Sequence, residues 1–171
     1  MRRLTVTLLV LVVAGTLAAP AARAEESKDQ AALAKALAEA KVSLEKGLVA
    51  SEGEGKPISA KFEIGDDGKL QLSVYTAKGD AFSGVVVDHK TGKVEKAEPI
   101  TSGEDLEAAK AQKEAMAKAK LALDKAVFKA AYAHRGYRAV SVYPSLKGGH
   151  PVAEVTLHKG NDWKTVTENL D

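Results

Sequence analysis

Four histidines are the side chains in this sequence best suited to bind a transition metal or to carry protons near neutral pH. They are His89, His134, His150 and His158. No two of them stand at the spacing that a helical turn or a hairpin would bring together on one ion. Cysteine, the other common ligand of such metals, does not occur in the chain. We therefore expect solvated histidines and no transition-metal site.

Four carboxylates in turns are the candidates for a harder cation. Glu52 and Glu54 stand in one expected loop, and Asp66 and Asp67 stand in an expected turn. The sequence has no D-x-D-x-D-G loop, so Ca²⁺ or a lanthanide-like ion would need ligands gathered from separate loops. Acidic residues in turns also serve turn geometry and solubility, and both interpretations remain open.

Residues for covalent or hydrolytic catalysis do not form a recognisable pattern. The sequence contains no cysteine, no G-x-S-x-G segment and no H-E-x-x-H segment. No serine has neighbours in sequence that suggest a base and an orienting acid. We expect no enzymatic activity, no catalytic residue and no cofactor.

The N-terminus has the three parts of a signal peptide. Arg2 and Arg3 precede an apolar run over residues 4–17, and Ala22 and Ala24 supply the small residues of a cleavage site. The run is shorter than the roughly 20 residues that a membrane span needs. We expect cleavage after Ala24, a periplasmic or secreted protein comprising residues 25–171, and no stable membrane insertion. A lipoprotein is excluded because its lipid is attached to cysteine.

The charge balance argues against nucleic acid as a partner. The chain has 25 basic and 23 acidic residues, and loss of Arg2, Arg3 and Arg23 with the signal peptide leaves 22 against 23, a net charge of −1. Binding to phosphates requires clustered Lys and Arg. We therefore expect no nucleic-acid binding.

Hydrophobic periodicity predicts a helix followed by strands in the first half of the expected mature chain. Ser27 with Gln30 is typical of a capping box, and leucines then recur at helical spacing until the glycines and proline of residues 53–57. Strands are expected at 58–64 and 70–74, where apolar and polar residues alternate. A third strand is expected at 82–87, where apolar residues follow one another between two turns, and it has a short continuation at 93–95.

The second half repeats this order. Ser102 begins an expected long helix that continues to about Ala133 and is closed by Gly136. Its weakly apolar beginning, together with the residues before it, forms an expected linker over residues 99–113. Strands are expected at 137–143, 152–157 and 163–167.

The two halves also match in local sequence, which indicates an internal duplication. Residues 41–46 align with 120–125, and residues 78–82 align with 159–163. We predict an α+β fold with two tandem units, each one helix packed on a three-stranded antiparallel sheet. The first unit would span residues 25–98 and the second, more divergent unit 114–171.

One turn carries a family resemblance. Asp88, Lys90, Thr91, Gly92 and Val94 follow an apolar strand in the order that is characteristic of the PepSY domain. The first unit resembles this family over its length, whereas the second matches in layout and lacks the Lys-Thr-Gly turn. Glycine permits the left-handed backbone of such a turn, and aspartate accepts hydrogen bonds from its amides.

The resemblance implies an exported, non-catalytic module that binds a protein partner in the envelope or outside the cell, or that inhibits a secreted peptidase. The alternative is a periplasmic protein that binds a hard cation. An exposed aromatic residue would favour the partner, and the candidates are Phe82, Phe128, Tyr137, Tyr143 and Trp163.

The expected export of the chain leads to a first testable prediction. Mass spectrometry of the protein from the cells that produce it should find Glu25 at the N-terminus. Intact Met1 in the membrane fraction would contradict cleavage.

Overall fold

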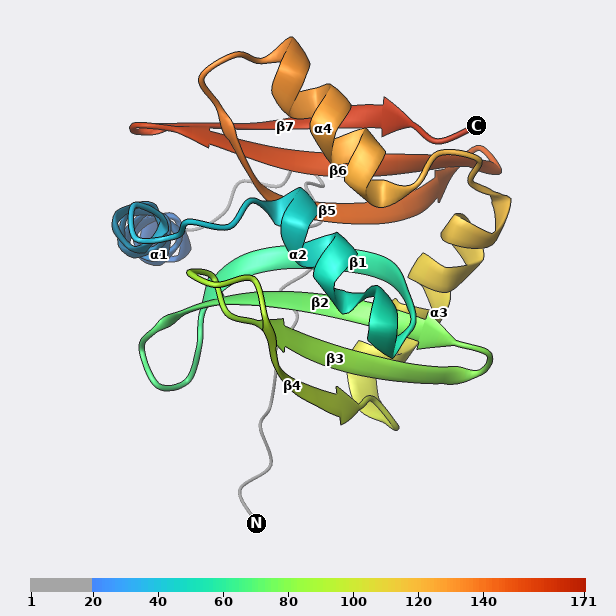
Figure 1. Cartoon of the computed structure of the whole chain (residues 1–171). Coiled ribbons are helices and arrows are strands. Elements are labelled where there is room, and N and C mark those ends of the chain that lie inside the picture. Colours follow the sequence, from blue (N-terminus) through green and yellow to red (C-terminus); the bar gives the residue numbers. More distant parts are fainter. Residues whose placement is uncertain (1–19) are drawn as a thin grey trace.

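The structure is a computed structural model that describes the backbone of residues 20–171 and the side chains of residues 29–171. The expected signal peptide, residues 1–24, lies outside the part whose side chains are described. The described chain has an α+β fold in which four α-helices pack on one antiparallel sheet of seven strands (Figure 1). No helix within residues 20–171 combines the length and apolarity needed to cross a membrane.

The elements follow a similar order in the two halves of the chain. The first half contains α1 (Pro20–Leu37), α2 (Leu44–Ala50), the 3-10 turn η1 (Ser51–Glu54), β1 (Lys56–Ile64), β2 (Leu70–Lys78), β3 (Ala81–Val87) and β4 (Val94–Pro99). The second half contains α3 (Gly103–Lys118), α4 (Leu123–Ala133), β5 (Arg138–Lys147), β6 (His150–Lys159) and β7 (Asp162–Asn169). Every strand expected from the sequence is present, and the continuation expected at 93–95 is part of the fourth strand, β4.

All strands belong to one sheet, where the sequence predicted two. The strand order is β4-β3-β2-β1-β5-β6-β7, so the halves meet where β1 pairs with β5. Ala60 lies opposite Val142, and Lys61 lies opposite Ser141. An unpaired edge leaves backbone N–H and C=O groups without partners, and joining β1 to β5 removes two such edges.

Each long helix expected from the sequence is broken into two, which corrects both predictions. In each break, two neighbouring N–H groups donate to one carbonyl just past the end of a strand: Lys41 and Val42 to His89 (2.9 and 3.0 Å), and Lys120 and Leu121 to Leu170 (2.7 and 3.1 Å). These tertiary bonds end the helices in segments that contain neither proline nor glycine. In addition, α1 already includes Pro20 and so extends upstream of the expected start at Ser27.

The short helices α2 and α4 lie side by side across one face of the sheet, which we call the helical face (Figure 1). The apolar side chains of the strands are buried beneath them, among them Ile58, Phe62, Leu72, Val74, Val85, Val142, Val155 and Leu157. Gly47 allows α2 to lie close to β2, because a Cβ at this position would be 2.2 Å from Cδ2 of Leu72.

The opposite face of the sheet is more polar and is partly covered by α3. The hydroxyl of Tyr75 in β2 donates to Asp105 in the first turn of α3 (2.9 Å). The stretch 99–113, expected to include a linker, runs from the end of β4 into α3. Ala109 and Gln112 of this stretch are buried, so it is packed against the fold.

A cation from each half binds the end of the other half's first helix. Arg138, the first residue of β5, donates to the carbonyls of Leu37 (3.1 Å), Ala40 (3.0 Å) and Val42 (2.6 Å). Its guanidinium lies 5.1 Å from the centre of the Phe62 ring, and burial lowers the pKa of Arg138. In turn Lys56, the first residue of β1, donates to the carbonyl of Met116 in α3 (3.3 Å). The two halves therefore stabilise each other.

Loss of the Arg138 guanidinium should destabilise the fold. We expect Arg138→Met to lower the free energy of unfolding by about 2–3 kcal/mol, because three partly buried hydrogen bonds to carbonyls lose their charged donor. Urea unfolding measures the change. The control, Arg135→Met, removes an exposed guanidinium and should cost less than about 1 kcal/mol. Equal losses in the two variants would contradict the role assigned to Arg138.

Candidate functional site

An apolar groove lies between α2 and α4 and has a volume of about 660 Å³. We call it the helix groove. It is lined by Ser43, Glu45, Lys46, Val49 and Ala50 beside and within α2, and by Asp124, Lys125 and Phe128 of α4.

The burial pattern of each helix determines which side chains reach the groove. In α2, Leu44 and Leu48 are buried against the sheet, and Oγ of Ser43 accepts the N–H of Lys46 (3.3 Å) to cap the helix. In α4, Leu123, Ala126, Val127 and Ala130 are buried at helical spacing. Apolar side chains that do not belong to these buried sets are left at the surface beside the groove.

Two stacked aromatic rings are the most prominent of these surface side chains. Phe128 is 60% exposed and Tyr132 is 64% exposed. Their ring centres are 5.9 Å apart, and the guanidinium of Arg135 lies 5.5 Å from the Tyr132 ring. Val49, which lines the groove together with Phe128, is 51% exposed. Contiguous exposed apolar surface of this kind marks contact sites on soluble proteins.

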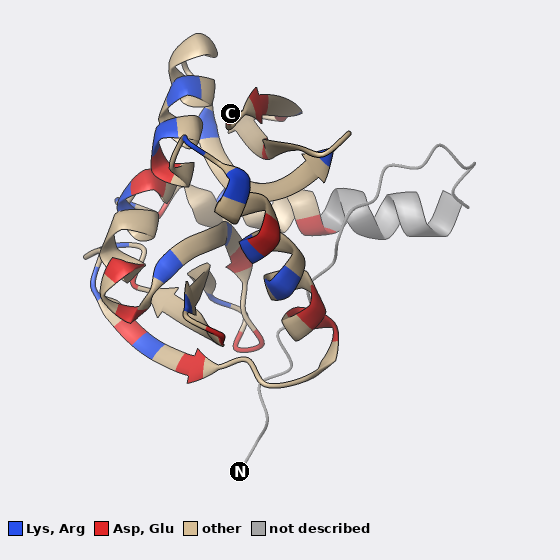
Figure 2. Ribbon diagram, turned by 90° about the vertical axis from the view of Figure 1, so that its right-hand side faces the viewer, with Lys and Arg blue, Asp and Glu red and all other residues tan. Residues whose placement is uncertain are grey.

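The rim of the helix groove carries charges of both signs. Glu45 and Lys46 stand on α2, and Asp124 and Lys125 stand on α4. Asp124 and Lys125 form an ion pair at 3.1 Å. Figure 2 shows the same interspersion of basic and acidic residues over a wider part of the described chain. Neither sign of charge dominates the groove.

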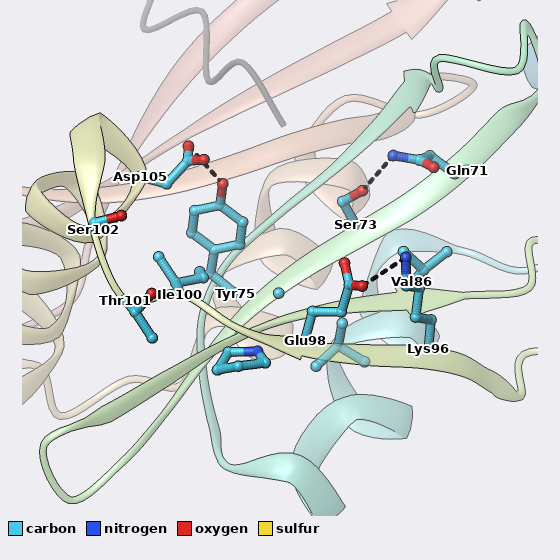
Figure 3. A pocket seen from close by; sticks show the side chains of 13 residues that line it. Gln71, Ser73, Tyr75, Val86, Lys96, Glu98, Ile100, Thr101, Ser102 and Asp105 are labelled. Carbon is cyan, nitrogen blue, oxygen red and sulfur yellow. Dashed lines mark hydrogen bonds and ion pairs between the residues drawn. The ribbon is translucent and has the colours of Figure 1, made fainter. Parts of the chain in front are cut away.

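A second hollow, of about 520 Å³, lies between β2, β3, β4 and the start of α3 (Figure 3). Its charged side chains are engaged with one another or with neighbours. Asp105 accepts the hydroxyl of Tyr75, and Lys96 pairs with Glu98 at 2.8 Å. Burial, together with the bond to Asp105, raises the pKa of Tyr75, so this hydroxyl remains a proton donor.

Beside this hollow, the carboxylate of Glu63 collects three donors. It accepts from Ser73 (2.6 Å) and Gln71 (3.0 Å), and it pairs with Lys61 at 2.5 Å. The Ser73 hydroxyl therefore donates to a carboxylate that is already neutralised by a lysine, which is not the arrangement of an activated nucleophile. The network joins β1 to β2, and it is better suited to stabilise this strand pair than to perform chemistry.

The four carboxylates considered for a cation lie in two different turns. Glu52 and Glu54 are in η1, whereas Asp66 and Asp67 are in the turn between β1 and β2. Oδ1 of Asp67 accepts the N–H of Lys69 (3.0 Å), which stabilises that turn. Among the described residues no group of three or more His, Cys, Asp or Glu side chains could hold a metal ion.

The four histidines also lie apart. Nδ1 of His134 contacts the carbonyl of Ala130 (2.9 Å), Nδ1 of His150 contacts Asp171 (3.0 Å), and Nε2 of His158 contacts the carbonyl of Gly160 (2.7 Å). Nδ1 of His89 is buried without a hydrogen-bond partner in the described part of the chain. None of these contacts joins two histidines.

Of the five aromatic residues that the sequence suggested as candidate anchors for a partner, one is exposed. Phe128 is exposed, Phe82 is buried, and Tyr137, Tyr143 and Trp163 are partly buried. Sequence reasoning did not single out Tyr132, which stacks on Phe128. The available signal was its spacing of four residues from Phe128 on one helix.

The turn after β3 positions α2. Oδ1 of Asp88 accepts the N–H groups of Thr91 (2.5 Å) and Lys90 (2.8 Å), and these bonds lower the pKa of Asp88. Gly92 has a φ of 76°, which disfavours other residues. The turn presents the His89 carbonyl that ends α1, so residues 88–92 help to place α2 at the groove.

Comparison of the chain with protein-family models, curated proteins and solved structures finds no match.

Removal of the Asp88 carboxylate should destabilise the protein in a pH-dependent way. Because the folded-state pKa of Asp88 is lowered, its contribution is complete above the unfolded-state pKa of 3.8 and is lost as the pH falls through the folded-state value. We expect Asp88→Ala to cost about 1 kcal/mol at neutral pH. The difference from the unmodified protein should shrink in acid.

Urea unfolding over a pH series measures this difference. Asp66→Ala, which removes an exposed carboxylate from another turn, is the control and should show no such trend. A difference for Asp88→Ala that stays constant from neutral to acid pH would contradict the assignment.

Proposed function

We propose that this chain is an exported, non-catalytic binding protein, built from two PepSY-like units, that holds a protein partner in the helix groove. One observation carries the proposal: Phe128, which lines an apolar groove, is largely exposed and stacks on the equally exposed ring of Tyr132. Aromatic side chains contribute a large share of the binding energy in protein interfaces.

Matching contacts in the two halves support the tandem organisation. The breaks at residues 41–42 and 120–121 use the same pattern of two N–H donors on one carbonyl. The first residues of β1 and β5, Lys56 and Arg138, each bind the end of the other half's first helix. These pairs of contacts agree with the alignment of the two halves in sequence.

The character of the helix groove favours a protein over a small molecule. Sites for small molecules enclose most of the ligand and aim a few polar groups at it. The helix groove is instead shallow and largely apolar, with its charges on the rim. Such a surface suits an amphipathic helix, whose apolar side chains recur every three or four residues. The PepSY resemblance suggests that the partner belongs to a secreted peptidase, which binding would inhibit.

Replacement of the exposed aromatic ring tests the proposal. Phe128→Ser should weaken partner binding at least tenfold, because truncation of a central aromatic anchor commonly costs 2 kcal/mol or more. The free energy of unfolding should change by less than about 0.5 kcal/mol, since the side chain is exposed. Val94→Ser, which removes an exposed apolar side chain from β4, is the matched control.

Affinity capture with residues 25–171 from envelope and secreted proteins of the producing cells is the measurement. A partner retained by the unmodified protein and by Val94→Ser, but lost by Phe128→Ser, supports the groove. Peptidase activity of the captured partner, assayed with and without added protein, tests inhibition. Capture that Phe128→Ser leaves unchanged contradicts the groove, and capture that a chelator abolishes favours the cation-binding alternative.

A further inference from the structure

The outer edge of β7 is well formed for pairing with another strand. All eight residues of β7 pair with β6 without a register shift, from Asp162 opposite Lys159 to Asn169 opposite Val152. β7 contains neither proline nor glycine. No strand among residues 20–171 pairs on its outer side. Such an edge exposes a row of backbone N–H and C=O groups.

The edge at β4, on the other side of the sheet, is less suitable. β4 is shorter than β7, and its pairing with β3 shifts register between Val86 and Val87. It ends at Pro99, which has no N–H group to donate. Of the two edges, β7 is therefore the better template for strand addition.

The first half of the chain shows a strand in the corresponding place. β3 and β7 are each the third strand of their half, and each is followed by a carbonyl that ends a helix, at His89 and Leu170. In the first half β4 pairs on the outer side of β3. The same position beside β7 is open within the described residues.

The side chains of β7 are complementary to themselves in one antiparallel register. Lys164, Val166 and Glu168 lie opposite Leu157, Val155 and Ala153, so they share the helical face. If two copies of β7 pair about a two-fold axis at Val166, Lys164 of each copy lies opposite Glu168 of the other. Opposite charges directly across a strand pair stabilise it.

The neighbouring registers lack this complementarity. An axis at Thr165 sets Asp162 opposite Glu168 of the other copy, which places like charges together. An axis at Thr167 sets Lys164 opposite Leu170 and Glu168 opposite Val166, so neither charge faces an opposite charge. The register centred on Val166 is the favourable one.

We propose that the β7 edge is a self-association surface, on which β7 of a second copy of this chain pairs antiparallel with Val166 at the two-fold axis. The two sheets then become continuous. Because the same surface is used by both copies, the assembly closes as a dimer. The surface is separate from the helix groove, so the dimer could hold two partners.

Two intramolecular contacts involve the charges of this surface. Glu168 pairs with Lys129 of α4 at 2.8 Å, and Nζ of Lys164 lies 4.6 Å from the centre of the Tyr137 ring. Both charges are thus held in place within each copy. A single substitution disturbs these contacts as well as the proposed interface, so the test uses a matched pair of charge reversals.

Light scattering of residues 25–171 after size-exclusion chromatography should show a dimer. Lys164→Glu sets glutamate against glutamate across the axis, and Glu168→Lys sets lysine against lysine. Each variant alone should raise the dissociation constant of the dimer at least tenfold. An equimolar mixture should recover a dimer, because the mixed pair restores both opposite-charge contacts. Lys96→Glu on β4 is the control and should leave the dimer unchanged, and circular dichroism confirms the fold of each variant.

The lack of native cysteine provides a second readout. In the proposed register, Val166→Cys brings two Cβ atoms to roughly 5 Å, so mild oxidation should give a disulfide-linked dimer. Ala97→Cys on β4 should remain largely monomeric. A monomeric unmodified protein at high concentration, a charge-reversed mixture that fails to associate, or pairing of the β7 edge only with a different protein would overturn the proposal.

Discussion

The paired donation of two loop N–H groups to one strand-end carbonyl is the interaction on which the rest of the structure depends. At His89 and again at Leu170 it stops a helix that local sequence would continue. A backbone N–H that bonds a distant carbonyl is withdrawn from the ladder of a continuing helix. The chain must then turn, and the short helices α2 and α4 can cross the sheet beside each other.

Close packing completes the arrangement that these bonds begin. Pairing of β1 with β5 makes the sheet continuous beneath both short helices. Gly47 allows α2 to approach Leu72, and the small side chains of Ala126 and Ala130 are fully buried in α4. The large side chains of Val49, Phe128 and Tyr132 are not packed in the interior and remain exposed at the surface. The groove is therefore a consequence of how the core is filled.

The strands could be predicted from sequence because period-two alternation is a local signal. The apolar residues of 58–62 and 70–74 are buried as this alternation predicts, although Ser59 and Ser73 are buried as well and Ile64 is exposed. The pairing of β1 with β5 is not local, since Ala60 and Val142 are distant in sequence and each would suit any apolar neighbour.

The two helix breaks could not be predicted from local sequence either. They are caused by hydrogen bonds to the carbonyls of His89 and Leu170, which are distant in sequence. The position of Phe128 could be predicted in part from the sequence. Phe128 directly follows Val127, which belongs to the buried face of α4. Its exposure depends on how α4 packs against α2 and the sheet. The polar network of Lys61, Glu63 and Ser73 was missed, because alternating polar residues ordinarily indicate a solvated face.

The reciprocal binding of helix ends has a consequence for the order in which the chain acquires its structure. A ribosome delivers the N-terminal half first. The carbonyls of Leu37, Ala40 and Val42 therefore lack their donor until Arg138 is made. Arg138 is separated from them by 101, 98 and 96 positions in sequence. Until Arg138 emerges, the nascent first half lacks the hydrogen bonds that Arg138 donates. The edge of β1 that later pairs with β5 is also unpaired. The end of the first helix therefore acquires these three hydrogen bonds only after residue 138 has been synthesised.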